Sequence, residues 1–255
     1  MSKLAVNYNQ KWLIQLHTID STNNYAIKLI EDGLAHHGDV VWSLEQTKGK
    51  GQRGKEWITK PNENIMISLI LKGEGLENYN PIQINIIIAQ TVCIYFKHII
   101  PKAKITIKWP NDIYINDKKT AGILIENVFR GNKWTSAIIG LGINVNQTQF
   151  PDFLPNAGSL ALFSNKQFDL FPIISDLRAG ILNAFNQFSN ENFENILNNY
   201  NNNLYGKNEY RTFINLKTKQ HFEGKVIEVD RNGFIIIETE DGKTKFTNGS
   251  LQWLF

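Results

Sequence analysis

The chain has 255 residues, of which 42% are hydrophobic and 20% are charged, and its formal net charge at pH 7 is +3. These proportions are typical of a globular protein with one large domain, or one domain and a small appendage, and they argue against disorder. The weak, scattered positive charge gives no support for nucleic-acid binding, so we expect no nucleic-acid partner. The single cysteine, Cys93, excludes an internal disulfide and favours a reducing cytoplasm.

No segment predicts export or membrane insertion. The first ten residues have no apolar signal core, and no stretch approaches the ~18 apolar residues of a membrane span. Residues 84–100 come nearest, but polar side chains interrupt the run, which therefore predicts a core helix. We expect a cytoplasmic protein that does not enter a membrane.

The first third of the chain alternates predicted strands with one short helix. A strand is expected at residues 12–16, and a helix over residues 20–33 begins with good N-cap residues and ends at a glycine. Strands at residues 39–45 and 64–71 flank a long segment rich in glycine and lysine. We call that segment, residues 46–63, the glycine-rich loop.

The middle of the chain begins with a helix and continues as β-rich segments. Asn80 followed by Pro81 predicts a helix that ends before Pro101. Turn residues at positions 116–117 and 131–132 predict hairpins, and hairpins imply a largely antiparallel or mixed sheet. The four strands are expected at residues 105–108, 113–115, 121–129 and 134–145.

The last third changes from helical to β-rich. Helices are expected at residues 169–188 and 191–204, the second of them rich in asparagine. From residue 210 to residue 255 the pattern predicts short strands, with turns at residues 231–233 and 241–242. This tail is interpreted as a small β-barrel.

Residues 49–55 match both the dinucleotide pattern G-x-G-x-x-G and the first seven positions of a P-loop. Both motifs require a helix to start at once, and a P-loop needs Ser or Thr where this chain has Glu56. Residues 57–61 are not a helix start, so we interpret both matches as accidental. Taken alone, the segment is equally consistent with a solvated basic loop.

The chemistry of the glycine-rich loop also suits an anion. Its glycines allow backbone N–H groups to approach a ligand closely, and Lys50, Arg53 and Lys55 provide cations for carboxylate or phosphate. Trp57 can stack on a purine or anchor the loop in the core, and the residues by themselves slightly favour anchoring.

Three more segments have small or polar residues at strand ends. Residues 108–112 (Lys-Trp-Pro-Asn-Asp) place a cation in a proline-fixed turn, which is either an active-site position or an ordinary turn with an exposed lysine. Residues 121–126 and 140–146 are apolar strands whose glycines permit close approach of a ligand or of another backbone. Each signal is weak alone.

In this order, the motifs resemble the catalytic domain of biotin protein ligases, over about residues 8–205. The tail resembles the small SH3-like domain that follows it in this family. The resemblance implies an α+β fold, with a mixed, largely antiparallel sheet and packed helices in residues 1–207 and an SH3-like β-barrel in residues 208–255. Only twenty residues precede Ser21, too few for the winged-helix segment of members that also repress biotin genes. The motifs are residues 20–23, Gln46, residues 49–55 with Trp57, and residues 108–112, 121–126 and 140–144.

The resemblance also assigns site residues. Lys108 and Lys50 are the implied catalytic cations, facing the biotin carboxylate and the α-phosphate. Hydroxyl and carboxamide groups match the donors and acceptor of the biotin ureido ring. The implied biotin-binding residues are Ser21, Thr22, Asn23, Gln46, Gly49, Lys50, Gly51, Lys108 and Gly122. The implied nucleotide-binding residues are Gln52, Arg53, Lys55, Trp57, Asn111 and Asn144.

The implied reaction has two steps. The biotin carboxylate attacks the α-phosphorus of ATP, and a lysine of a biotin carboxyl carrier protein then attacks biotinyl-5'-AMP. Mg²⁺ is expected with ATP, but the sequence has no cluster of metal-ligand spacing, so no protein metal ligand is assigned. Cys93 is interpreted as a core residue, and a homodimer is possible because the family often dimerises.

Two alternatives and one departure remain. Lipoate–protein ligase shares a related fold and adenylation chemistry, but residues 49–55 and 108–112 favour the biotin branch. A non-catalytic, biotin-responsive regulator is disfavoured because both Lys50 and Lys108 are present. Gln52 departs from the family, because many relatives have an arginine there that retains the adenylate.

Overall fold

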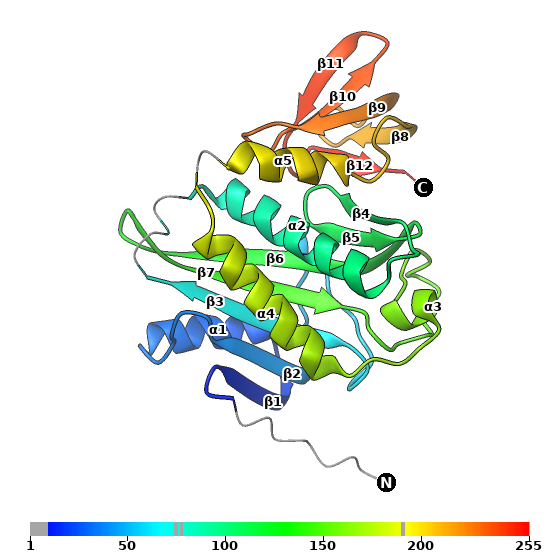
Figure 1. Cartoon of the computed structure of the whole chain (residues 1–255). Helices are drawn as coiled ribbons and strands as arrows, with labels where there is room; N and C mark the ends of the chain where they lie inside the picture. Colours follow the sequence, from blue (N-terminus) through cyan, green and yellow to red (C-terminus); the bar gives the residue numbers. More distant parts are fainter. Residues whose placement is uncertain (1–9, 74–75, 77–78, 190–191, 255) are drawn as a thin grey trace.

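The computed structural model describes residues 10–73, 76, 79–189 and 192–254. It contains a seven-stranded sheet of order β1-β2-β3-β7-β6-β5-β4 and a five-stranded sheet of order β11-β10-β9-β8-β12. Figure 1 shows the smaller sheet at one end of the molecule, beyond α5. The α+β class predicted from the sequence is confirmed.

The seven-stranded sheet is mixed and largely antiparallel. Only β1 and β2 pair in parallel, because α1 connects them, and every other neighbouring pair is antiparallel. Asn116 and Asp117 have positive φ angles of 45° and 67° and close the β5–β6 hairpin, as their turn chemistry predicts. The strands are β1 (Leu13–Ile19), β2 (Val40–Gln46), β3 (Ile65–Lys72), β4 (Ile105–Lys108), β5 (Asp112–Ile115), β6 (Lys118–Arg130) and β7 (Lys133–Ile143).

Helices cover both faces of this sheet. α1 packs on one face with Val41, Ile70 and Ile138, whereas α2 and α4 belong to the large core on the other face (Figure 1). The alternation of neighbouring residues such as Val40 and Val41 between the two clusters follows from the period of two in a strand. The helices are α1 (Thr22–Glu31), α2 (Pro81–Ile99), α3 (Leu160–Ser164), α4 (Leu170–Asn186) and α5 (Phe193–Asn202).

The helix α3 and the start of the last helix differ from what the sequence indicates. The sequence does not predict α3, because five residues are too short to show helical periodicity. The predicted start of the last helix at residue 191 lies outside the described residues, as does most of the N-terminal segment in which no signal core was expected.

α2 corrects one expectation. It starts at a capping box, in which Asn80 accepts from the Ile82 N–H and the Gln83 side chain accepts from the Asn80 N–H. With 19 residues it is long and apolar enough to cross a membrane, which corrects the expectation that no segment approaches the length of a membrane span. It nevertheless packs against α4, α5 and β4, and half of its apolar stretch is buried inside the protein. The prediction of a core helix is therefore confirmed.

The C-terminal sheet contains the predicted short strands and is antiparallel, but it is not the predicted closed barrel. β11 and β12 are at opposite ends of the strand order, so the predicted barrel is corrected to an open sheet. β12 has three residues, all paired with β8, and four of the five residues of β11 are exposed, which leaves little strand to close a ring. The strands are β8 (Tyr210–Asn215), β9 (His221–Val229), β10 (Ile235–Thr239), β11 (Gly242–Phe246) and β12 (Leu251–Trp253).

Candidate functional site

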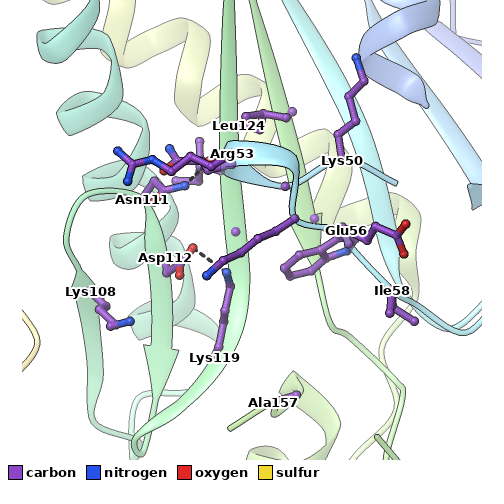
Figure 2. Close-up of a pocket in the computed structure, with 18 of the residues that line it drawn as sticks. Lys50, Arg53, Glu56, Ile58, Lys108, Asn111, Asp112, Lys119, Leu124 and Ala157 are labelled. Carbon is purple, nitrogen blue, oxygen red and sulfur yellow. Dashed lines mark hydrogen bonds and ion pairs between the residues drawn. The ribbon is translucent and has the colours of Figure 1, made fainter. Parts of the chain in front are cut away.

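A cavity of about 690 Å³ lies between the seven-stranded sheet, the glycine-rich loop and the C-terminal sheet. Figure 2 shows its lining residues from the loop and from the larger sheet. Of the residues predicted for the site, only Gly49 is not among its lining residues. A Cβ on Gly49 would lie 2.4 Å from the Trp57 carbonyl oxygen, so this glycine lets the loop pack on itself. The predicted residues that line the cavity are Ser21, Thr22, Asn23, Gln46, Lys50, Gly51, Gln52, Arg53, Lys55, Trp57, Lys108, Asn111, Gly122 and Asn144.

One end of the cavity is a buried hydrogen-bonded cluster at the start of α1. The Gln46 Oε1 accepts from the Thr22 N–H at 2.7 Å and from the Thr22 hydroxyl at 3.1 Å. The buried Ser68 hydroxyl lies 2.5 Å from Asn23 Oδ1 and 2.8 Å from Thr22 Oγ1. Sequence reasoning missed Ser68, although a serine inside the apolar strand β3 is a signal that could have been used.

Lys50 lies at the edge of this cavity, and its side chain is directed toward α1 and β6. Its Nζ donates to Asn24 Oδ1 at 2.5 Å and lies 3.9 Å from the Glu126 carboxylate. Glu126 also accepts from the Asn23 amide at 2.6 Å. Lys50 therefore belongs to a polar network with side chains of α1 and β6. Figure 2 shows Lys50 pointing away from Lys108, and the structure therefore does not bring the two predicted cations together.

The other end of the cavity contains a lysine cluster, Lys55, Lys108 and Lys119, around Asp112. Lys119 Nζ forms an ion pair with Asp112 Oδ1 at 2.8 Å (Figure 2). Burial lowers the pKa of Lys108 to about 8; the Asp112 charge opposes this shift, and the charges of Lys119 and Lys55 reinforce it. Sequence reasoning missed Lys119 and the role of Asp112, although Lys119 lies just before the predicted strand at residue 121.

Lys108 is enclosed by aromatic rings from both sheets. Its Nζ lies 5.6 Å from the ring centre of Tyr114 and 5.7 Å from that of Trp253. Both distances are within reach of cation–π attraction, which partly offsets the loss of hydration. A C-terminal residue therefore shapes the surroundings of this lysine.

Trp57 lies on the floor of the cavity. A Cβ on Gly142 would be 2.4 Å from the Trp57 Cε2, and one on Gly122 would be 3.0 Å from Cζ3. The predicted close approach at the glycines of β6 and β7 is thus made by an indole ring of the chain itself. Lys119 Nζ lies 5.5 Å from the ring centre, which joins Trp57 to the lysine cluster.

Asn111 and Asn144 have structural hydrogen bonds in addition to lining the cavity. The Asn111 amide donates to the Ile123 carbonyl at 2.5 Å, and the Asn144 amide donates to the Gly158 carbonyl at 3.0 Å. Both side chains are buried. They hold the ends of β5 and β7 against neighbouring segments, and this fixes one wall of the cavity.

The two phosphate-loop patterns do not have their usual structure. Residues 52–54 form a single 3-10 turn, η1 (Gln52–Gly54), and an extended segment rather than a helix follows it. The interpretation of these matches as accidental is confirmed. Cys93 is buried in α2, and burial raises the pKa of its thiol to about 11, which suits a core residue.

Metal-binding groups are sparse in the part of the chain that the structure describes. No group of three or more His, Cys, Asp or Glu side chains is found there with the spacing of a metal site. Asp112 and Glu56 are the carboxylates among the cavity-lining residues.

Comparison with known proteins places this arrangement in a family. A family model described as the biotin/lipoate A/B protein ligase family matches residues 16–144. The bifunctional ligase/repressor BirA of Bacillus spizizenii is 30% identical to the chain over 246 residues, covering 94% of this chain and 73% of that protein. The chain belongs to the biotin/lipoate A/B protein ligase family.

Two further proteins are similar to this ligase-family chain. The biotin–[acetyl-CoA-carboxylase] ligase of Paracoccus denitrificans is 35% identical over 129 residues, covering 49% of this chain and 51% of that protein. The structure of biotin protein ligase from Aquifex aeolicus in complex with biotin and ATP matches with a TM-score of 0.79 at 23% identity, covering 96% of this chain and 99% of that one. This structural match confirms the ligase fold predicted from the sequence.

The ligase-family match ends at residue 144 and so covers the buried cluster, the glycine-rich loop and the lysine cluster. The C-terminal residues that line the same cavity, among them Asn248, Gly249 and Trp253, lie beyond it.

Proposed function

We propose that this protein is a biotin protein ligase. It activates biotin with ATP to biotinyl-5'-AMP and transfers the biotinyl group to a specific lysine of a biotin carboxyl carrier protein. The observation that carries the proposal is one cavity with a buried hydroxyl and carboxamide cluster at one end and a lysine cluster at the other. The printed names of the relatives, which include biotin–[acetyl-CoA-carboxylase] ligase, favour biotin as the acid.

The buried cluster is the proposed biotin head-group site. Gln46 uses its carbonyl oxygen to accept from Thr22, so its amide nitrogen is the donor it offers to the ureido carbonyl. Ser21, Thr22 and Asn23 lie at the start of α1 beside it and add hydroxyl and carboxamide groups. Gly51 and Gly122 complete the proposed slot, and Gly49 supports it by letting the loop fold against Gln46 and Trp57.

The lysine cluster is the proposed site of phosphate and carboxylate charge. Lys119 Nζ lies 3.5 Å from where a Cβ on Gly122 would be, so it is at the junction of the biotin slot and the nucleotide side. Lys108 is more deeply buried than Lys119, and the charge of Lys55 reaches Lys108 from the glycine-rich loop. We therefore propose Lys119 together with Lys108 as the catalytic cations, and assign Lys50 to positioning the loop through Glu126.

The first step requires no enzyme nucleophile. The biotin carboxylate oxygen forms a bond to the α-phosphorus of ATP while the bond to pyrophosphate breaks. Cations on both sides lower the repulsion between two anions and stabilise charge in the transition state. Asn111, Asn144, Gln52, Arg53 and Trp57 are the remaining proposed nucleotide neighbours. Mg²⁺ would accompany ATP and would neutralise phosphate charge, and Asp112 is the carboxylate of the lysine cluster that would help to hold it.

In the second step the neutral amine of the carrier lysine attacks the acyl carbon of the anhydride, AMP leaves with the bonding electron pair, and the amine proton is lost to solvent. Lys108 and Lys119 stabilise the charge that develops on oxygen. A unit boundary near residue 207, a cytoplasmic location, a homodimer and the absence of a nucleic-acid partner stay predictions from the sequence and the resemblance.

One experiment separates the proposed function from its rivals. The protein is mixed with ATP, Mg²⁺, a purified biotin carboxyl carrier domain and either biotin or lipoate, and the carrier is weighed by mass spectrometry. We expect a biotinyl adduct on the carrier in the reaction with biotin and no adduct in the reaction with lipoate. A carrier whose target lysine is replaced by arginine should stay unmodified in both. Modification by lipoate would favour a lipoate ligase, and absence of any pyrophosphate release would favour a non-catalytic regulator.

A further inference from the structure

The tip of the glycine-rich loop rests on a turn of the C-terminal sheet. The Asn248 carboxamide faces η1 with both of its groups: its Oδ1 accepts from Arg53 Nη2 at 3.4 Å, and its Nδ2 donates to Gln52 Oε1 at 3.5 Å. Asn248 belongs to residues 247–250, which connect β11 to β12 and which we call the 247–250 turn. The contact joins residues 195 and 196 positions apart in the sequence.

Gly249 provides the surface on which the Arg53 side chain lies. A Cβ added at Gly249 would be 1.3 Å from Arg53 Nη2 and 1.5 Å from its Cζ, so the guanidinium occupies the space of the missing side chain. Gly249 also has a φ of +83°, which favours glycine. Arg53 itself is in the left-handed region, with φ 59° and ψ 43°, an unfavourable conformation for arginine that the docked side chain helps to stabilise.

The C-terminal sheet is attached to the catalytic unit independently of this contact. The Trp109 Nε1 donates to the Gly233 carbonyl at 3.1 Å, and Asn201 exchanges two hydrogen bonds with the Val229 backbone at 2.9 and 2.7 Å. The sheet is therefore a fixed support, whereas Arg53 and Gly54 of η1 are exposed. Asn248 and Gly249 also line the cavity, so the support lies at the nucleotide side.

We infer that the 247–250 turn is a positioning element for the reaction: by seating the Arg53 side chain on Gly249 and Asn248, it holds the loop tip over the nucleotide side of the cavity. The C-terminal sheet thereby increases nucleotide affinity without contributing a charged group of its own. This inference rests on the proposed function, and it adds residues that lie beyond the family match.

The test compares two glycines in turns of the same sheet. Gly249→Ala displaces Arg53, the end of a flexible side chain, so the fold is expected to survive while the loop tip is released. Gly242→Ala is the matched control, because Gly242 has a φ of +108° but nothing within 4 Å of its added Cβ. Asn248→Ala removes the hydrogen bonds without adding an atom.

For Gly249→Ala and Asn248→Ala we expect the KM for ATP in biotin-dependent pyrophosphate release to rise roughly three- to tenfold, as for loss of one or two exposed hydrogen bonds, with kcat little changed. Gly242→Ala should behave as wild type. In an Arg53→Ala background, Gly249→Ala should have no further effect, because the two changes remove the same contact.

A second readout does not depend on activity. Hydrogen–deuterium exchange of the ligand-free proteins should become faster at residues 51–56 in Gly249→Ala and not in Gly242→Ala. Unchanged exchange and unchanged KM in Gly249→Ala would overturn the inference and leave the proposed function intact. A wild-type protein that forms no biotinyl-adenylate would overturn the proposed function, while the exchange experiment would still decide whether the turn holds the loop.

Discussion

At the scale of single residues, the direction of each lysine decides its role. Lys50 and Lys119 are both cavity-lining cations, but Lys50 is paired with Asn24 and Glu126, whereas Lys119 is paired with Asp112 beside Lys108. The ion pair of Lys119 with the cavity carboxylate Asp112 orients its ammonium toward the proposed reacting groups. The catalytic cations are therefore expected on β4 and β6.

Lys119→Ala and Lys108→Ala should each lower the rate of biotinyl-adenylate formation by about 10²-fold or more, because each removes a cation from the transition state. Lys118→Ala is the control, since Lys118 is the preceding residue and its Nζ donates to the Pro155 carbonyl. Circular dichroism checks the fold, and pyrophosphate release is the assay. Near-normal release by Lys119→Ala would remove that residue from the mechanism.

The pKa of Lys108 predicts a pH dependence. Its pKa is lowered from 10.5 to about 8, so the free enzyme holds the proton below pH 8 and loses it as the pH rises through that value. Because the charged form is the one that stabilises phosphate, kcat/KM for ATP should fall above about pH 8. Lys108→Arg keeps the charge and should shift this decline to higher pH. An unchanged profile in the arginine variant would assign the decline to another group.

At the scale of elements, the glycine-rich loop is held by other elements at three points, Lys50, η1 and Trp57. Trp57 anchors it on the glycines of β6 and β7, Lys50 ties it to α1 and β6, and η1 rests on the 247–250 turn. Of the loop's cations, Lys55 is thus the one that contributes to the lysine cluster. The loop forms a wall of the cavity, in which Lys50, Arg53 and Lys55 have separate partners.

Gln52→Arg tests how η1, at the tip of the glycine-rich loop, retains biotinyl-adenylate. A guanidinium can make charge-assisted hydrogen bonds to phosphate of about 1.5–3 kcal/mol, whereas a carboxamide makes neutral ones nearer 0.5–1.5 kcal/mol. Since Arg53 is engaged by Asn248, it compensates only in part, and Gln52→Arg should slow the dissociation of biotinyl-adenylate several-fold. The off-rate of labelled adenylate measures this. Equal off-rates would mean that Lys55 and the lysine cluster provide the retention.

At the scale of the whole molecule, the cavity depends on two sheets that share one core. Buried residues of both sheets, such as Ile107 and Phe213, form a continuous hydrophobic cluster, and Trp253 reaches Lys108. A shared core fixes the C-terminal sheet against the larger sheet, so it is not a loosely attached appendage.

The charge of the whole molecule also leads to a prediction. A net charge of +3, scattered along the sequence, provides little phosphate neutralisation, so we expect no sequence-specific DNA binding, with or without biotin and ATP. Footprinting on promoters of biotin genes is the measurement, with a bifunctional ligase/repressor as the positive control. A protected site would contradict the prediction.

Local chemistry was enough to predict much of this protein. The capping box at Asn80, the turn at Asn116 and Asp117 and the strand Ile105–Lys108 depend on neighbouring residues, so the sequence determines them. The ordered motifs likewise indicate the family from the sequence alone, because they preserve residue types at set spacings.

Only the tertiary structure decided which charged groups meet. Lys50 is turned aside by Asn24 and Glu126, which lie 26 and 76 positions away in the sequence, and Lys119 meets Asp112 only because β5 and β6 pair. Strand patterns predict the strands of the C-terminal sheet but not whether its edges close, since closure depends on pairing between distant strands. The contact of Arg53 with Gly249 also depends on tertiary structure. A glycine makes room for another side chain only where the fold brings that side chain to it.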